Sequence, residues 1–131
     1  MIASSRGLPV WAANLVGSKR LRVAAVVCVA LLIYLSWVPG PYEVRTNLPG
    51  RIEHSVAYAG AAISFALAYP LSRPGIIAAA FVSLAGVLEA GQIYIPGRHA
   101  AVLDWLSSSI GAASGAWLGT HVRAFLAPLK R

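Results

Sequence analysis

The sequence is poor in charged residues, and in acidic residues above all. Only 4 of its 131 residues are Asp or Glu, and charged residues make up 11% of the chain. A soluble globular domain carries about 25% charged residues, because its surface faces water. A surface that faces hydrocarbon needs none. Since 58% of the residues are hydrophobic and the mean hydropathy is +0.69, the composition predicts a membrane protein. The length predicts a single domain.

Cysteine and metal-ligand patterns are also scarce. Cys28 is the single cysteine, so a disulfide within the chain is excluded. A cysteine-based metal site would lack ligands, and no H-E-x-x-H pattern is present. We therefore expect no metal and no other cofactor.

The charge that is present is mostly positive. The net charge is +7 and the pI is about 10.4. Nucleic-acid binding would call for a basic stripe with interleaved aromatic residues, which the sequence lacks. Basic residues that flank membrane helices serve as topology signals and contact anionic headgroups. We therefore expect membrane lipids, and no nucleic acid, as partners.

Four apolar stretches are each long enough to cross a bilayer. They run over about 21–38, 55–71, 75–95 and 102–122. Roughly 20 residues of helix cover the ~30 Å of a hydrocarbon core. A backbone in hydrocarbon must satisfy its own hydrogen bonds, and the alternating segments of spanning strands are missing, so we expect helices. Proline and glycine mark the boundaries at 39–41, 49–50, 70–74 and 96–97.

The basic residues predict the orientation, because cytoplasmic loops carry the excess of Lys and Arg. With the N-terminus inside, most of the 11 basic residues lie on the cytoplasmic side: Arg6, Lys19, Arg20, Arg22, Arg73, Arg123, Lys130 and Arg131. The others lie outside: Arg45, Arg51 and Arg98. The expected fold class is all-α, an integral membrane bundle of four transmembrane helices with N- and C-termini cytoplasmic.

This topology divides the chain into three parts. We expect a cytoplasmic N-terminal segment over 1–20, a four-helix membrane domain over 21–122 and a basic cytoplasmic tail over 123–131. A cleaved signal peptide is disfavoured, because the first apolar run exceeds the usual 7–15 residues and Val38-Pro39-Gly40-Pro41 is a poor cleavage context. The protein is therefore expected to be multi-pass.

Polar residues gather toward the outer face under this topology. Every acidic residue lies in an outer loop or in the outer third of a helix: Glu43, Glu53, Glu89 and Asp104. The same holds for His54, Gln92, Arg98 and His99. A charge at the bilayer centre costs at least about 2.5–3.5 kcal/mol, and less near the interface. Such residues need a partner or a function.

Helical spacing places several of these residues on shared faces. The pairs are His54 with Tyr58, Glu89 with Gln92, and Asp104 with Ser108. We expect Glu89, Asp104 and His54 to converge at the outer mouth of the bundle. Arg98, in the hairpin between the third and fourth helices, is the expected countercharge.

Each of these residues also has a structural alternative. An interhelical hydrogen-bond pair accounts for Glu89 and Gln92, and a helix cap accounts for Asp104. His54 would then be an interfacial histidine, and Arg98 would extend its guanidinium to headgroups. No functional role is expected for Glu43, His99 and His121.

The spacing resembles the signature of the VanZ-like family of bacterial membrane proteins. That signature reads E-x-x-Q, three residues, P-G-R, five residues and D, with glycines after it. It is matched here by Glu89, Gln92, Pro96-Gly97-Arg98, Asp104, Gly111 and Gly115. An earlier element, K-x-x-H-x-x-x-Y, is matched by Arg51, His54 and Tyr58. Two positions depart from the family, with Gly50 in place of Asp and Ser108 in place of Asn.

The resemblance implies a multi-pass protein of the bacterial inner membrane. It also implies a link to cell-wall glycans or lipid-linked precursors. The family is named for a protein that gives low-level resistance to the glycopeptide teicoplanin, so an effect on glycopeptide susceptibility is a further expectation.

The first functional hypothesis is binding of an anionic lipid-linked or cell-wall precursor. Arg98 and Arg51 would contact phosphate or carboxylate groups, because guanidinium matches them in bidentate geometry. Glu89 and Asp104 would orient the arginine. The expected ligand-binding residues are Arg51, His54, Tyr58, Glu89, Gln92, Arg98, Asp104 and Ser108.

Two other hypotheses stay open. An enzyme, a hydrolase or transferase acting on a lipid-linked substrate, would use Glu89, Asp104 and His54 as general acid and base. A purely structural bundle would form a homo-oligomer through Gly111 and Gly115, because small residues let helices approach closely in lipid. A transporter would require several copies of so short a chain.

Overall fold

The computed structural model describes residues 10–127, and within that range every regular element is a helix. Its α-helices are α1 (Val10–Leu15), α2 (Lys19–Trp37), α3 (Gly50–Ala68), α4 (Pro74–Gly91) and α5 (Val102–Leu126). Short 3-10 turns follow α2 and α4, namely η1 (Gly40–Tyr42) and η2 (Gln92–Tyr94). The predicted all-α class is confirmed. The ends of the predicted N-terminal segment and basic tail, 1–9 and 128–131, lie outside the described residues.

The observed boundaries follow the prolines more closely than the apolar stretches. Hydropathy places the second helix over 55–71, whereas α3 starts directly after Pro49 and ends before Tyr69-Pro70. Proline is well tolerated ahead of the first helical turn and disfavours helix in the residue before it. The polar first turn of α3 was missed because a hydropathy criterion omits it.

Two of the described helices are long and apolar enough to cross a membrane. They are α2 and the continuous segment Pro74–Tyr94, which joins α4 to η2. Only 11% of the apolar window in α2 is buried inside the chain, against 33% in the second segment. α3 and α5 have 19 and 25 residues but carry more Ser, Gly, Thr and His.

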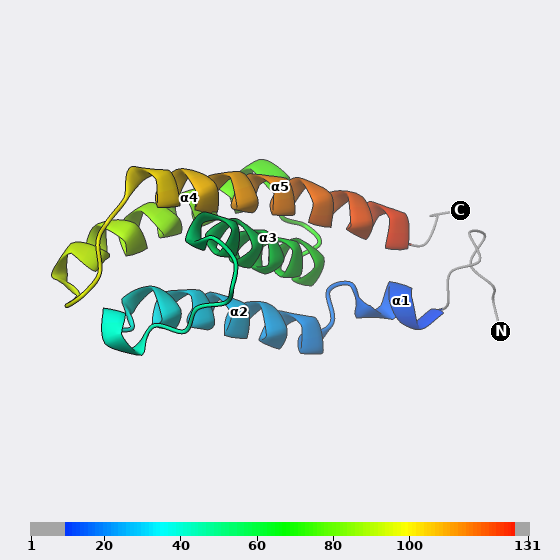
Figure 1. The fold of residues 1–131 in the computed structure, drawn as a ribbon. Helices are drawn as coiled ribbons and strands as arrows, with labels where there is room; N and C mark the ends of the chain where they lie inside the picture. The colour runs from blue at the N-terminus through cyan, green and yellow to red at the C-terminus, as the bar shows by residue number, and fades with distance from the viewer. Residues whose placement is uncertain (1–9, 128–131) are drawn as a thin grey trace.

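α3 lies between α2 on one side and α5 on the other (Figure 1). The core between the helices is built mainly from alanine, with aromatic residues at its centre. The Phe81 ring makes edge-on contacts with Tyr58 and Phe65, at centroid separations of 6.5 and 5.8 Å. The buried alanines of this core are Ala61, Ala62, Ala66, Ala85, Ala112 and Ala116. Small side chains therefore set a close spacing between the helices.

Glycines give α5 its close approach to α3. A Cβ atom added to Gly111 would collide with the carbonyl oxygen of Ser55, and one added to Gly115 would collide with that of Ala59. The stripe of small residues predicted on the fourth helix thus packs inside the chain. A homo-oligomer through Gly111 and Gly115 would need a face that α3 already covers, and oligomerisation stays a prediction.

α2 is held to the other helices mainly at its two ends. Near its C-terminus the Trp37 indole donates to the Leu88 carbonyl at 3.3 Å. Ahead of its N-terminus the amide of Gly17 donates to the Leu67 carbonyl at 2.9 Å. Between these ends α2 buries only Ala25 and Leu32. α2 therefore contributes fewer buried side chains to the core than α3, although Leu32 belongs to that core.

Candidate functional site

Two Pro-Gly turns meet at one end of the bundle, where α2 and α4 end and α3 and α5 begin. We call this the polar end, and it comprises the connections 38–49 and 92–101. The amide of Gly40 donates to the carbonyl of Pro96 at 3.0 Å. Gly97 has a φ of +75°, which favours glycine, and it lies directly against Gly40. This close contact carries the next residue, Arg98, to the end of α2.

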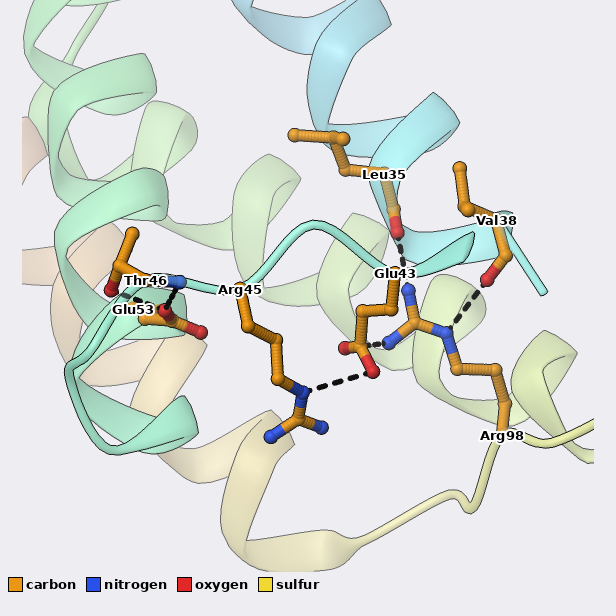
Figure 2. Close-up of polar contacts among 7 residues, drawn as sticks. All are labelled: Leu35, Val38, Glu43, Arg45, Thr46, Glu53 and Arg98. Carbon is orange, nitrogen blue, oxygen red and sulfur yellow. Dashed lines mark hydrogen bonds and ion pairs between the residues drawn. The ribbon is translucent and has the colours of Figure 1, made fainter. Parts of the chain in front are cut away.

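The Arg98 guanidinium caps the C-terminal end of α2 (Figure 2). Its Nε donates to the carbonyl of Val38 at 2.9 Å, and Nη2 donates to that of Leu35 at 2.6 Å. Nη1 donates to the Glu43 carboxylate. The last carbonyls of a helix have no partner within the helix, so these bonds satisfy groups that would otherwise need water. The Arg98 side chain is only 9% exposed.

Glu43 joins Arg98 to a second arginine. Its other carboxylate oxygen, Oε2, lies 3.0 Å from Nε of Arg45. This hydrogen bond, together with the Glu43 charge, raises the pKa of the Arg45 guanidinium above its ordinary value. The predicted pairing of Arg98 with Glu89 is therefore wrong. Glu43, for which no role was expected, is the countercharge.

Glu89 and Gln92 are buried near the end of α4, at 8% and 4% exposure. The Glu89 carboxylate accepts a hydrogen bond of 2.7 Å from the amide of Ala101, the residue before α5. Glu89 thus fixes the start of α5 relative to α4. It joins two helices, as its structural alternative supposed, but through a backbone amide instead of a side chain.

Arg51 and Asp104 link the first turns of α3 and α5. Their closest atoms lie 3.7 Å apart, and the Arg51 side chain is 61% exposed. The cap position of α5 is Ala101, which makes no side-chain cap bond, so Asp104 acts as a first-turn acid and ion-pair partner. Ser108 is buried one turn further along α5.

Glu53 ties the connection after α2 to the first turn of α3. Its Oε1 accepts from the Thr46 amide at 2.6 Å and also from the Thr46 hydroxyl. These bonds fasten the connection 38–49 to the first turn of α3.

A cavity of about 370 Å³ lies between α2 and α3 beneath this connection. We call it the α2–α3 cavity. Its walls are apolar, with Leu32, Leu35, Val44, Leu48, Val56 and Ala57. Its polar lining comprises Ser36, Glu43, Thr46, Glu53, His54, Tyr58 and Arg98. It is therefore amphipathic, with a hydrocarbon-like interior and charges at one end.

The predicted site residues divide into two groups around this cavity. His54, Tyr58 and Arg98 line it. The others are not among its lining residues: Arg51, Glu89, Gln92, Asp104 and Ser108. Of the three candidate catalytic groups only His54 reaches the cavity. In residues 10–127 no group of three His, Cys, Asp or Glu side chains is placed to hold a metal ion.

No family model, curated protein or solved structure matches this chain. The VanZ-like resemblance is therefore carried by the motif residues alone. In the structure most of these residues fasten the helices at the polar end, and two of them, His54 and Tyr58, line the cavity without capping a helix.

Proposed function

We propose that the chain is a multi-pass membrane protein that binds an envelope lipid in the α2–α3 cavity. A hydrocarbon chain would lie between α2 and α3, and the polar head would lie under the connection 38–49. The observation that carries this proposal is the amphipathic lining of the cavity, with apolar walls and a charged end. Ligand sites are usually concave and mostly apolar, with a few convergent polar groups.

Four spans are the arrangement that best suits the packing. α3 packs against α2, α5 packs against α4, and α3 and α5 pack against each other, so α3 and α5 would share the bilayer with α2 and α4. At 1.5 Å per residue, α3 is about 28 Å long, close to the ~30 Å hydrocarbon thickness, and α5 is about 37 Å long, enough to cross it and enter a headgroup region. Large apolar side chains are exposed on the outward faces, such as Val26 at 56%, Val87 at 64% and Ile110 at 65%. Exposure of so much apolar surface would be unfavourable in water, whereas contact with lipid chains is favourable.

The polar end is proposed to face the outside of the bacterial inner membrane. Only three of the 11 basic residues lie in it or in the first helical turn that follows it, namely Arg45, Arg51 and Arg98. An end with few basic residues favours the extracytoplasmic side. The cavity would then open toward the outer leaflet, where lipid-linked envelope molecules are exposed.

Membership of the VanZ-like family is part of the same proposal. Several motif residues make contacts that stabilise the bundle: Arg98 caps α2, Glu89 fixes the start of α5, and Arg51 pairs with Asp104. His54 lines the cavity, and Tyr58 borders it from the core, where its side chain is buried. An effect on teicoplanin susceptibility follows from the resemblance and stays a prediction.

Binding is favoured over catalysis because the expected acid and base do not converge. Glu89 is engaged with a backbone amide and Asp104 with Arg51. General acid–base work needs groups within hydrogen-bond reach of one substrate. An anionic ligand on Arg98 is also less favoured than expected, since that guanidinium already makes three bonds.

Filling the cavity should abolish lipid binding. We expect Ala57→Trp to reduce the lipid that co-purifies with the protein by about tenfold or more, because the indole would occupy the apolar wall. Native mass spectrometry of protein extracted in a mild detergent measures the bound lipid. Ile110→Trp, on an outward face of α5, is the matched control and should retain it. Equal lipid on wild type and Ala57→Trp would contradict the proposal.

A further inference from the structure

The charges that line the α2–α3 cavity leave one carboxylate without an ionic partner. Glu43 is neutralised by Arg98 and Arg45, which bind its two oxygens. Glu53 makes no salt bridge within the described residues, and its Oε1 is occupied by Thr46. Its other oxygen, Oε2, accepts no hydrogen bond from residues 10–127. The cavity therefore presents a free carboxylate oxygen to its occupant.

A guanidinium with free N–H groups lies on the same connection as the Thr46 that holds Glu53. Figure 2 shows the Arg45 guanidinium turned toward Glu43, and its positive charge also attracts Glu53. Arg45 uses Nε for Glu43, while its Nη atoms donate no hydrogen bond inside the described part of the chain. Its side chain is 63% exposed. Arg45 does not itself line the cavity, but it lies on the connection between two lining residues, Val44 and Thr46. A headgroup that protrudes from the cavity past Glu53 would therefore meet one acceptor and one donor, of opposite charge.

We propose that the cavity selects a zwitterionic aminophospholipid, with the ammonium group on Glu53 and the phosphodiester on Arg45. This inference rests on the proposed lipid-binding function and specifies the headgroup. An ammonium carries N–H donors for the free carboxylate oxygen, and arginine suits a phosphate. A purely anionic head would meet Glu53 as a like charge. A trimethylated head keeps its charge but has no N–H to donate.

A competition between headgroups tests the inference. Wild-type protein is incubated in mixed micelles with equal amounts of phosphatidylethanolamine, phosphatidylglycerol and phosphatidylcholine of one chain length, and bound lipids are counted by native mass spectrometry. We expect about a fivefold preference for phosphatidylethanolamine over each of the others. Glu53→Gln keeps the side-chain shape and should reduce that preference to about twofold or less. His99→Gln, a polar change at the same end outside the cavity, should leave the preference intact.

The outcomes separate this inference from the proposed function. Lipid binding with phosphatidylglycerol equal to or above phosphatidylethanolamine in the wild-type protein would overturn the inference alone, and that comparison needs no variant. An unchanged preference in Glu53→Gln would do the same. If the wild-type protein carries no bound lipid of any headgroup, the lipid-binding function is overturned as well.

Discussion

Replacing Gly111 with alanine is expected to lower the free energy of unfolding by about 3 kcal/mol, the upper part of the range for overpacking. The added methyl group would collide with the backbone carbonyl of Ser55, which cannot rotate away as a side chain can. α5 would have to withdraw from α3, and the small-residue contacts along the interface would weaken with it. Equilibrium unfolding in mixed micelles, followed by circular dichroism, measures the loss.

Gly60→Ala is the matched control for this prediction. Gly60 also lies inside a helix, but a Cβ added there has no neighbour within 4 Å. Alanine should therefore be neutral or stabilising by about 0.5–1 kcal/mol, through its better helix propensity. If Gly111→Ala and Gly60→Ala unfold alike, α3 and α5 do not pack as closely as described.

Removing the Arg98 side chain is expected to cost about 3 kcal/mol, because it leaves two carbonyls at the end of α2 and one oxygen of the Glu43 carboxylate without their donor. Arg98→Ala would free the Leu35 and Val38 carbonyls and the Glu43 carboxylate at once. Arg98→Lys should recover only part of the loss, because an ammonium cannot replace the planar fork of three donors. The same unfolding measurement applies to both variants.

Arg51→Ala provides the comparison for an exposed arginine at the same end. Its ion pair with Asp104 spans 3.7 Å and its side chain is 61% exposed. Such pairs contribute about 1 kcal/mol or less. Equal losses in Arg98→Ala and Arg51→Ala would mean that the guanidinium of Arg98 does not hold α2 in place.

The helical layout could be predicted because its causes are local in sequence. Apolar stretches and prolines placed α2 and the starts of α4 and α5 within two residues of the observed bounds. The stretch predicted to end at 95 covers both α4, which ends at Gly91, and η2. The small-residue stripe correctly marked the face of α5 that packs closely, because only small residues allow such contact in lipid. Its partner was not predictable, since a stripe does not say whether it meets α3 or a second copy.

The ionic partners at the polar end could not be predicted for the same reason. Helical spacing shows which residues share a face of one helix, but Arg98 meets Glu43 across 55 residues of sequence. Glu43 lies in an irregular connection without periodicity, so no spacing singled it out. The sequence did mark Glu43 as a candidate partner for an arginine in one way, because it is one of only four acidic residues in the chain.

The contacts of the tryptophans also could not be predicted from their position in the sequence. Position near the ends of apolar stretches predicts an interfacial role for Trp37 and Trp105. In the structure their indoles donate to the carbonyls of Leu88 and Val82. They fit against α4 where Gly91 and Gly86 leave room. Glycine at these positions of α4 was a signal for ring packing that hydropathy alone does not use.

The proposal that four helices span the membrane with the polar end outside has one direct test. In a Cys28→Ala background, Asn47→Cys and His99→Cys mark the polar end, and Arg73→Cys marks the opposite end. All three positions are exposed. A membrane-impermeant maleimide added to intact cells should label residues 47 and 99, and should label residue 73 only after permeabilisation. Labelling of residue 73 in intact cells, with 47 and 99 protected until permeabilisation, would contradict the orientation. Labelling of all three would contradict the four spans.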